Sequence, residues 1–146
     1  MTRAMDFPTP YVRKPFYYET DRMGVVHHSN YIRWLEEARI DFITKLGAPY
    51  SRLDAVGVEI PVISAECEYK LPVRYGDEVG IKTALSFFNG VRMTFSYEIY
   101  FTDSGKLSAR GQTSHCFVDA ATMRPLNLKK RCLEYYETVM RAYEAE

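Results

Sequence analysis

Two runs of alternating apolar and polar residues, joined by Asn89-Gly90, constrain the fold of this chain more than any other feature of its sequence. The first run covers residues 79–87 and the second covers 91–101, and apolar side chains occupy every second position of both except Thr83. Successive side chains of a strand point to opposite faces, so both runs are predicted to be strands with one buried face. Asn-Gly favours a type I′ turn, because both central residues of that turn need positive φ. The sequence therefore predicts an antiparallel hairpin.

Further strands are expected on both sides of this hairpin. Residues 63–71 alternate between apolar and polar side chains, which predicts a strand with one covered face. A turn at 103–106 leads into another predicted strand from about 107 to 118, in which Gly111 is a candidate β-bulge. An aromatic-rich segment at 11–18 is a candidate first strand, and its internal proline confines it to a sheet edge or makes it irregular.

A helical pattern separates the first candidate strand from the others. From residue 29 to residue 46, apolar side chains recur at three- and four-residue steps, with Ser29 as the expected N-cap and Gly47 as the expected stop. Because the apolar surface is wide, we expect this helix to lie deep in the protein. A closing helix is predicted over 128–145. The apolar residues of the first helix are Tyr31, Ile32, Trp34, Leu35, Ala38, Phe42, Ile43 and Leu46.

The predicted order is a strand, a long helix, four antiparallel strands and a terminal helix, in a single domain spanning residues 1–146. One long helix wrapped by one curved antiparallel sheet is an α+β architecture. The concave face of such a sheet buries the helix, while its free edges or its outer face invite self-association.

The composition argues against several classes of protein. The 146 residues carry 19 Lys plus Arg and 19 Asp plus Glu, so no net charge is available to hold nucleic acid or an anionic membrane. No apolar run approaches the ~20 residues of a membrane span, and residues 1–6 run into a proline-rich stretch rather than the hydrophobic region of a signal peptide. We therefore expect a soluble cytoplasmic protein. The cysteines, expected to be reduced and partly buried, are Cys67, Cys116 and Cys132.

The chemistry of the chain is concentrated in residues 17–31, immediately before and at the start of the long helix. This stretch places acidic, imidazole, hydroxyl and amide groups beside the unpaired backbone N–H groups and the positive dipole end of the helix. Such a helix end can hold an oxyanion, and Asp21 beside it can act as a general base on water or attack a carbonyl directly. The combination suits acyl transfer to water.

This stretch resembles the motif of the hotdog-fold acyl-CoA thioesterases of the 4-hydroxybenzoyl-CoA thioesterase family, which includes proteins associated with the Tol-Pal system. The resemblance extends to a second motif at 69–77 and to the strand order, so it spans nearly the whole chain. Glu19 departs from the family pattern, which often has Asp at that position, but it keeps the negative charge. The matching residues are Tyr17, Thr20, Asp21, Gly24, Val25, Val26, His28, Tyr31, Trp34, Glu36 or Glu37, and Arg39, then Tyr69, Pro72, Tyr75, Gly76 and Asp77.

The resemblance implies an acyl-CoA thioesterase that releases a carboxylic acid and CoA, with Asp21 as nucleophile or general base and His28 orienting water or substrate. Backbone N–H groups around His28 and Ser29 would polarise the thioester carbonyl. A thiol has a pKa of about 8.5 and leaves as thiolate, so it needs less acid assistance than an alcohol or amine. No separate cofactor is implied, because coenzyme A is part of the substrate.

The resemblance also implies homodimers with a sheet continued across subunits, or homotetramers. The implied substrate-binding residues are Tyr17, Gly24, Val25, Val26, Ser29 and Asn30.

Each of these residues also has a purely structural interpretation. Asp21 can stabilise a turn before Gly24, and His28 can form hydrogen bonds without taking part in chemistry. His27 and His28 make a weak metal pair because adjacent residues point in different directions, so no metal site is predicted. The basic run at 129–131 is a candidate contact for CoA phosphates, but such a run is more often a solvated face. The CoA-contacting residues and the acyl group therefore stay unassigned.

Two other functions fit the same fold. One is a hydratase or dehydratase that acts on the β-carbon of an acyl thioester, and the other is a non-catalytic module that binds acyl-carrier protein. A hydratase needs an acid and a base across the acyl chain, whereas the motif resembles the thioesterase pattern. A cysteine nucleophile is not expected, because His115 and Cys116 are neighbours in a predicted strand and face opposite sides.

Overall fold

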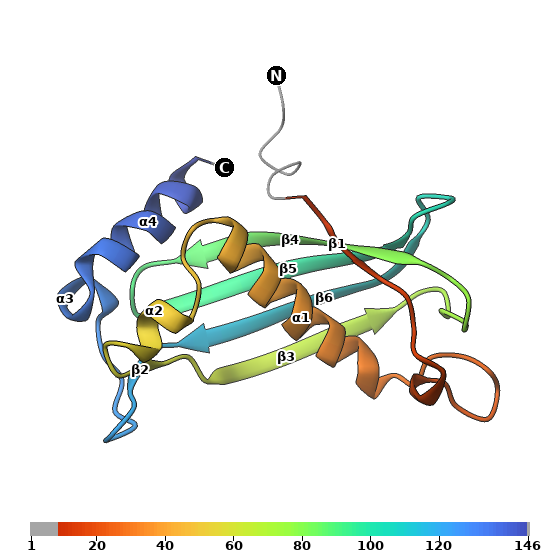
Figure 1. The fold of residues 1–146 in the computed structure, drawn as a ribbon, viewed down its shortest axis with the longest axis horizontal. Helices are drawn as coiled ribbons and strands as arrows, with labels where there is room; N and C mark the ends of the chain where they lie inside the picture. Colours follow the sequence, from red (N-terminus) through yellow and green to blue (C-terminus); the bar gives the residue numbers. More distant parts are fainter. Residues whose placement is uncertain (1–8, 146) are drawn as a thin grey trace.

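Residues 9–145 are described by a computed structural model, in which a long helix lies across one face of an antiparallel sheet (Figure 1). The sheet has five strands in the order β1-β4-β5-β6-β3, and a separate two-stranded sheet pairs β2 with β7. The predicted α+β architecture is confirmed. Residues 1–6, where no signal peptide is expected, lie outside the described residues. The strands are β1 (Tyr11–Arg13), β2 (Val58–Glu59), β3 (Val62–Tyr69), β4 (Val79–Phe88), β5 (Arg92–Phe101), β6 (Leu107–Cys116) and β7 (Val118–Asp119).

The predicted long helix is α1 (Ser29–Lys45). Gly47 follows it as the predicted stop, with a φ of +87° and an N–H that donates to the carbonyl of Thr44 at 3.0 Å. The N-cap is His28 rather than Ser29, because α1 already begins at Ser29. Its side chain forms no capping hydrogen bond. The other helices are the 3-10 helix η2 (Tyr17–Glu19), α2 (Ser51–Asp54), α3 (Leu128–Arg131) and α4 (Leu133–Glu144).

The buried side of α1 packs on the central strands, as its wide apolar surface predicts. Trp34, Leu35 and Ile43 are fully buried there. Gly111 is not a β-bulge, since β6 keeps a regular register with both neighbouring strands at this residue. A Cβ atom on Gly111 would lie 2.6 Å from Cδ1 of Leu35, so the glycine allows α1 to approach the sheet closely.

The predicted hairpin is the antiparallel pair of β4 and β5. Its turn differs from the expected type I′ geometry, because Gly90 has a φ of +85° whereas Asn89 does not have positive φ. Instead, the side-chain oxygen of Asn89 accepts hydrogen bonds from the backbone N–H groups of Val91 at 2.9 Å and Arg92 at 2.8 Å. The asparagine therefore closes the turn with its side chain rather than with its own backbone conformation.

Three expectations on the outer elements need correction. β3 is an edge strand, and along it only Cys67 is even half-buried, so the predicted covered face is absent within this chain. In the aromatic-rich segment the strand is shorter than predicted: only β1 is a strand, at a sheet edge as expected, and η2 follows it. The closing helix is interrupted at Cys132, whose φ of −148° lies outside the helical range and separates α3 from α4.

The cysteines are free and half-buried, as expected. Among the helices of residues 9–145, none combines the length and the apolarity needed to span a bilayer.

Candidate active site

A tight turn carries Asp21 between η2 and α1. Thr20 and Val26 form an antiparallel bridge at its base. The N–H of Asp21 donates to the carbonyl of Val25 at 2.7 Å, and the N–H of Gly24 donates to the carbonyl of Asp21 at 3.0 Å. Gly24 has a φ of +78°, a conformation that favours glycine. The turn is therefore fixed by its own backbone.

The carboxylate of Asp21 takes part in the same turn. Its Oδ1 accepts hydrogen bonds from the N–H of Met23 at 2.8 Å and the N–H of Val25 at 3.3 Å. Both bonds go to one oxygen, so Oδ2 is the oxygen left for chemistry. The structural interpretation of Asp21 as a turn residue thus holds, and it is compatible with a reactive second oxygen on the half-buried side chain.

The two motifs found in the sequence meet at this turn. The buried Val26 donates its N–H to the carbonyl of Val73 at 2.8 Å, and Val25 forms a bridge with Arg74. One residue further on, the ring of Tyr75 lies edge-on to the exposed ring of Tyr17, with 5.6 Å between the ring centroids. The second motif therefore supports the turn from the side, and Tyr17 packs against it.

The start of α1 lies directly after the turn. The Nδ1 of His27 accepts the N–H of Ser29 at 3.2 Å and lies 2.8 Å from the Ser29 hydroxyl. The exposed ring of His28 stacks on His27 with centroids 4.2 Å apart, and the hydroxyl of Tyr69 on β3 donates to the His28 carbonyl at 3.2 Å. Edge strand β3 thus touches the helix end at which the site is expected.

Asn30 and Tyr31 both hold the structure together at this helix end. The Asn30 side-chain amide donates to the backbone carbonyl of Glu19 at 2.9 Å. Tyr31 is buried, and its hydroxyl accepts the N–H of Val73 at 3.3 Å. Tyr31 is therefore a core residue, as its place in the apolar surface of the predicted helix indicates.

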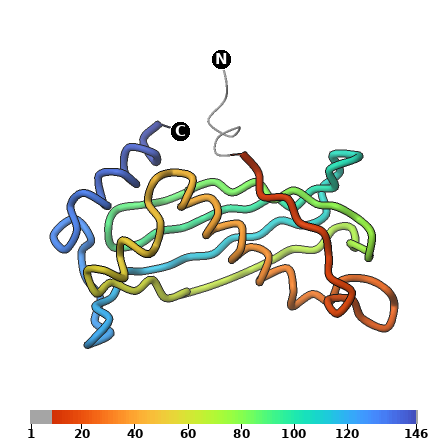
Figure 2. The backbone as a smooth tube through the Cα atoms, in the orientation of Figure 1, coloured from red at the N-terminus to blue at the C-terminus, as the bar shows by residue number. Residues whose placement is uncertain are grey.

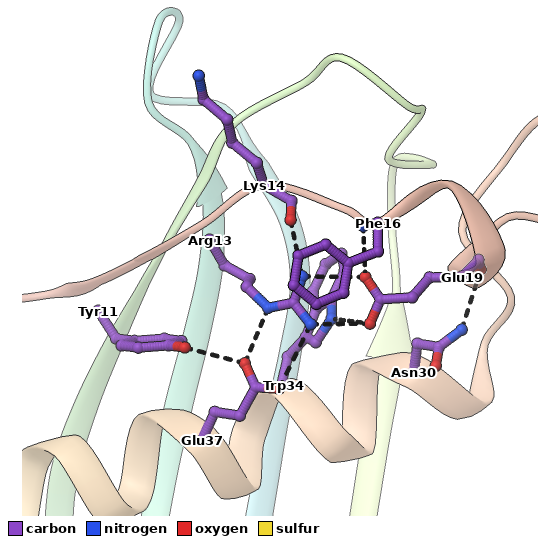
Figure 3. Close-up of polar contacts among 8 residues, drawn as sticks. All are labelled: Tyr11, Arg13, Lys14, Phe16, Glu19, Asn30, Trp34 and Glu37. Atoms are coloured by element: carbon purple, nitrogen blue, oxygen red, sulfur yellow. Dashed lines mark hydrogen bonds and ion pairs between the residues drawn. The ribbon is translucent and has the colours of Figure 1, made fainter.

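Glu19 is a residue whose part in the site the sequence did not reveal. Only 4% of the residue is exposed, and its carboxylate forms an ion pair with Arg13 of β1 at 2.8 Å (Figure 3). Burial alone would raise the pKa of Glu19, but hydrogen bonds from the Phe16 N–H, Trp34 and Arg13 hold it below its ordinary value. Arg13 also bonds Glu37 of α1 at 2.8 Å, so Glu37 rather than Glu36 joins this network.

A groove of about 750 Å³ runs along the outer face of α1 beside this network. Its walls include Phe16 and Tyr18 on one side and Arg33 and Ile40 of α1 on the other, and it reaches the turn at Thr20. In Figure 2 the chain can be followed from β1 along α1, through the turn and back into α1. In the turn itself, Arg22, Met23 and Gly24 are exposed and Asp21 is half-buried.

A second polar cluster lies inside the core under α1. The guanidinium of Arg39 donates to the hydroxyl of Tyr97 at 3.3 Å, and that hydroxyl lies 2.7 Å from the hydroxyl of Thr113. His115 Nε2 lies 2.9 Å from the same Thr113 oxygen. His115 is buried with a structural hydrogen bond, whereas its strand neighbour Cys116 is only half-buried.

The remaining candidates stay apart from the turn. The basic run at 129–131 lies on α3, at the opposite end of the sheet from the turn (Figure 1), and Arg131 forms an ion pair with Asp119 at 2.7 Å. Within residues 9–145, no group of three or more His, Cys, Asp or Glu side chains could hold a metal ion.

Comparison with known proteins places this geometry in context. Residues 17–135 match the thioesterase-like superfamily. Acyl-CoA thioester hydrolase YbgC of Escherichia coli is 29% identical over 115 residues, which cover 79% of this chain and 85% of that protein. The structure of a DHNA-CoA thioesterase from Staphylococcus aureus superposes with a TM-score of 0.88 at 30% identity, covering 92% of this chain and 90% of that one. A structure from Aquifex aeolicus superposes with a TM-score of 0.78 at 37% identity, covering 88% and 99%.

Proposed function

We propose that this chain, which belongs to the thioesterase-like superfamily, hydrolyses the thioester bond of an acyl-CoA to a carboxylic acid and CoA. Thioester hydrolysis is the activity named for its relatives, and the acyl-CoA substrate is the class that YbgC and the S. aureus thioesterase are named for. The observation that carries the proposal is the turn that holds Asp21 directly before the N-terminus of α1.

In the proposed reaction, Asp21 acts through Oδ2, the oxygen that does not close the turn. As a general base it takes a proton from water, whose oxygen attacks the thioester carbonyl. As a nucleophile it attacks the carbonyl itself, and water then cleaves the resulting anhydride. In both routes the C–S bond breaks, CoA leaves as thiolate and takes up a proton, and the acyl group leaves as a carboxylate.

The developing negative charge on the carbonyl oxygen would be stabilised by the start of α1, where backbone N–H groups and the helix dipole favour an anion. The N–H of Ser29 already donates to the Nδ1 of His27 at 3.2 Å. We therefore propose the N–H of His28 as the main donor to the carbonyl oxygen of the substrate. The exposed His28 ring is then available to orient water or substrate.

We also propose that the chain forms a homodimer in which β3 edges meet, with pairing of dimers into a tetramer as a further step. Support comes from the apolar side chains that β3 exposes, among them Val62, Ile63 and Tyr69. Because Tyr69 bonds the His28 carbonyl, a second copy on β3 would lie next to the site. A complete site would then need two copies of the chain.

The test of the catalytic proposal is a panel of aliphatic and aromatic acyl-CoA compounds, with released thiol trapped by a chromogenic disulfide. Asp21→Asn keeps a side-chain oxygen to close the turn, whereas Asp21→Ala does not. Both variants should lose activity by at least about 100-fold, and Asp21→Asn should keep the wild-type melting temperature. Undiminished hydrolysis in both would remove Asp21 from the chemistry. Enoyl turnover without thiol release would favour the hydratase alternative.

A further inference from the structure

Glu19 lies two residues before Asp21, and its carboxylate is surrounded by hydrogen-bond donors (Figure 3). Oε1 accepts from the N–H of Phe16 at 2.7 Å and from Nη1 of Arg13 at 3.0 Å. Oε2 accepts from Nη2 of Arg13 at 2.8 Å and from Nε1 of Trp34 at 3.1 Å. One buried side chain therefore joins β1, the start of η2 and the core face of α1.

The backbone of Glu19 holds the other end of the same loop. Its carbonyl accepts the N–H of His27 at 2.8 Å and the side-chain amide of Asn30 at 2.9 Å. The segment that carries Asp21 leaves Glu19 and returns to it at His27. Any shift of Glu19 therefore moves both ends of this segment together.

We propose that Glu19 is a positioning residue for the proposed reaction: its buried carboxylate fixes the loop of residues 20–28 and thereby the placement of Asp21 and of the α1 N-terminus. This inference rests on the proposed function of Asp21. It assigns Glu19 no contact with substrate, since its carboxylate is fully engaged by protein donors. Displacement of a reacting group by about 1 Å can reduce a rate about 100-fold, so loose anchoring should appear in kcat.

Glu37 provides a matched control within the same network. It shares Arg13 with Glu19, accepting from Nε at 2.8 Å, and it also accepts from the hydroxyl of Tyr11 at 3.0 Å. Its side chain is 37% exposed and lies on α1, away from the backbone of the loop. Removing either carboxylate takes one partner from Arg13, but only the loss of Glu19 releases the loop.

The experiment compares Glu19→Gln, Glu37→Gln and the wild type in steady-state thiol release, with rates divided by the folded fraction. In Glu19→Gln an amide NH2 replaces one of the two carboxylate oxygens. Each of these oxygens accepts from two donors, so the NH2 group would face two donors at either place. We expect kcat to fall about 10- to 100-fold, with KM within about threefold of wild type. Glu37→Gln should keep the wild-type kcat. Glu19→Asp, which keeps the charge, should recover part of the loss and remains informative if Glu19→Gln does not fold.

A wild-type kcat in folded Glu19→Gln and Glu19→Asp would overturn the inference and reduce Glu19 to a stabilising ion pair. If the wild type hydrolyses no acyl-CoA, the proposed function fails, and amide hydrogen exchange then tests the anchoring separately. The amides of Asp21 and His27 should exchange at least about tenfold faster in the Glu19 variants than in Glu37→Gln, because local opening sets their exchange rates. Equal exchange in all variants would overturn the anchoring role.

Discussion

Leu35 lies so close to Gly111 that a Cβ atom on the glycine would come 2.6 Å from Cδ1 of the leucine. The backbone carbonyl oxygen of Glu66 on β3 would lie 3.1 Å from the added Cβ atom. Leu35 is fully buried, so it has little room to move aside. This contact sets how closely α1, and with it the candidate site at its N-terminus, approaches the sheet.

Gly111→Ala should therefore destabilise the protein by about 1–3 kcal/mol through overpacking. The measurement is urea unfolding at fixed protein concentration. In a Leu35→Val background, which removes the clashing carbon, the same substitution should cost less than it does in the wild type. Equal costs in the two backgrounds would show that the contact with Leu35 is not the cause.

Alanine substitutions at Gly24 and Gly57 separate the effect of backbone strain on stability from the effect of the Asp21 turn on activity. Both have positive φ, +78° and +70°. A Cβ atom on Gly24 would come no nearer than 4.0 Å to Nη1 of Arg74, and one on Gly57 would meet nothing within 4 Å. Gly24→Ala and Gly57→Ala should therefore each cost about 1 kcal/mol through backbone strain alone. Only Gly24→Ala should also lower kcat in the thiol-release assay, because Gly24 lies in the turn. Equal kcat values in the two variants would contradict the importance of the turn.

The spacing of apolar residues predicted the regular helices and strands, because this spacing shows which side of each single element is buried. The alternation at 79–101 indicated the hairpin, and the three- and four-residue steps from residue 29 indicated α1. Gly111 was misinterpreted because a glycine in a strand fits either a bulge or a close approach of another element. Only the position of Leu35 distinguishes the two, and Leu35 is far away in the sequence.

The candidate site also has one part that the sequence predicted and one part that it did not. The sequence located the turn of Asp21 and the helix start after it, since the motif is local. It left Glu19 as a conservative departure from a family pattern, because the partners that explain it, Arg13 and Trp34, come from different elements and meet only in three dimensions. No local pattern carries that information.

His115 should make the stability of the protein depend on pH. Burial and, secondarily, the positive charge of Arg39 lower the pKa of His115 to about 4, and only 1% of the residue is exposed. The unfolded chain, with an ordinary His pKa of about 6.5, takes up the proton first as pH falls. The stabilisation is therefore complete above about pH 6.5 and is lost towards pH 4, at up to about 1.4 kcal/mol per pH unit.

The measurement is the free energy of unfolding in urea at several pH values between 7.5 and 4.5, for the wild type and for His115→Gln. The variant has no titrating ring, so its stability should vary less across this range. Parallel curves for the two proteins would show that His115 does not titrate on unfolding in this window.

The two edges of the sheet give the last prediction. The alternation in β3 predicts a covered face that this chain does not supply, which fits an edge covered by a second copy. Ile63 on β3 and Val12 on β1 are exposed to a similar degree, 46% and 54%, on opposite edges of the same sheet. Ile63→Lys would bury an unpaired charge in a β3 interface and should raise the dimer dissociation constant at least about tenfold, whereas Val12→Lys should leave it unchanged. Sedimentation over a range of protein concentrations measures both constants, and a wild-type constant for Ile63→Lys, or a monomeric wild type, would rule out assembly through β3.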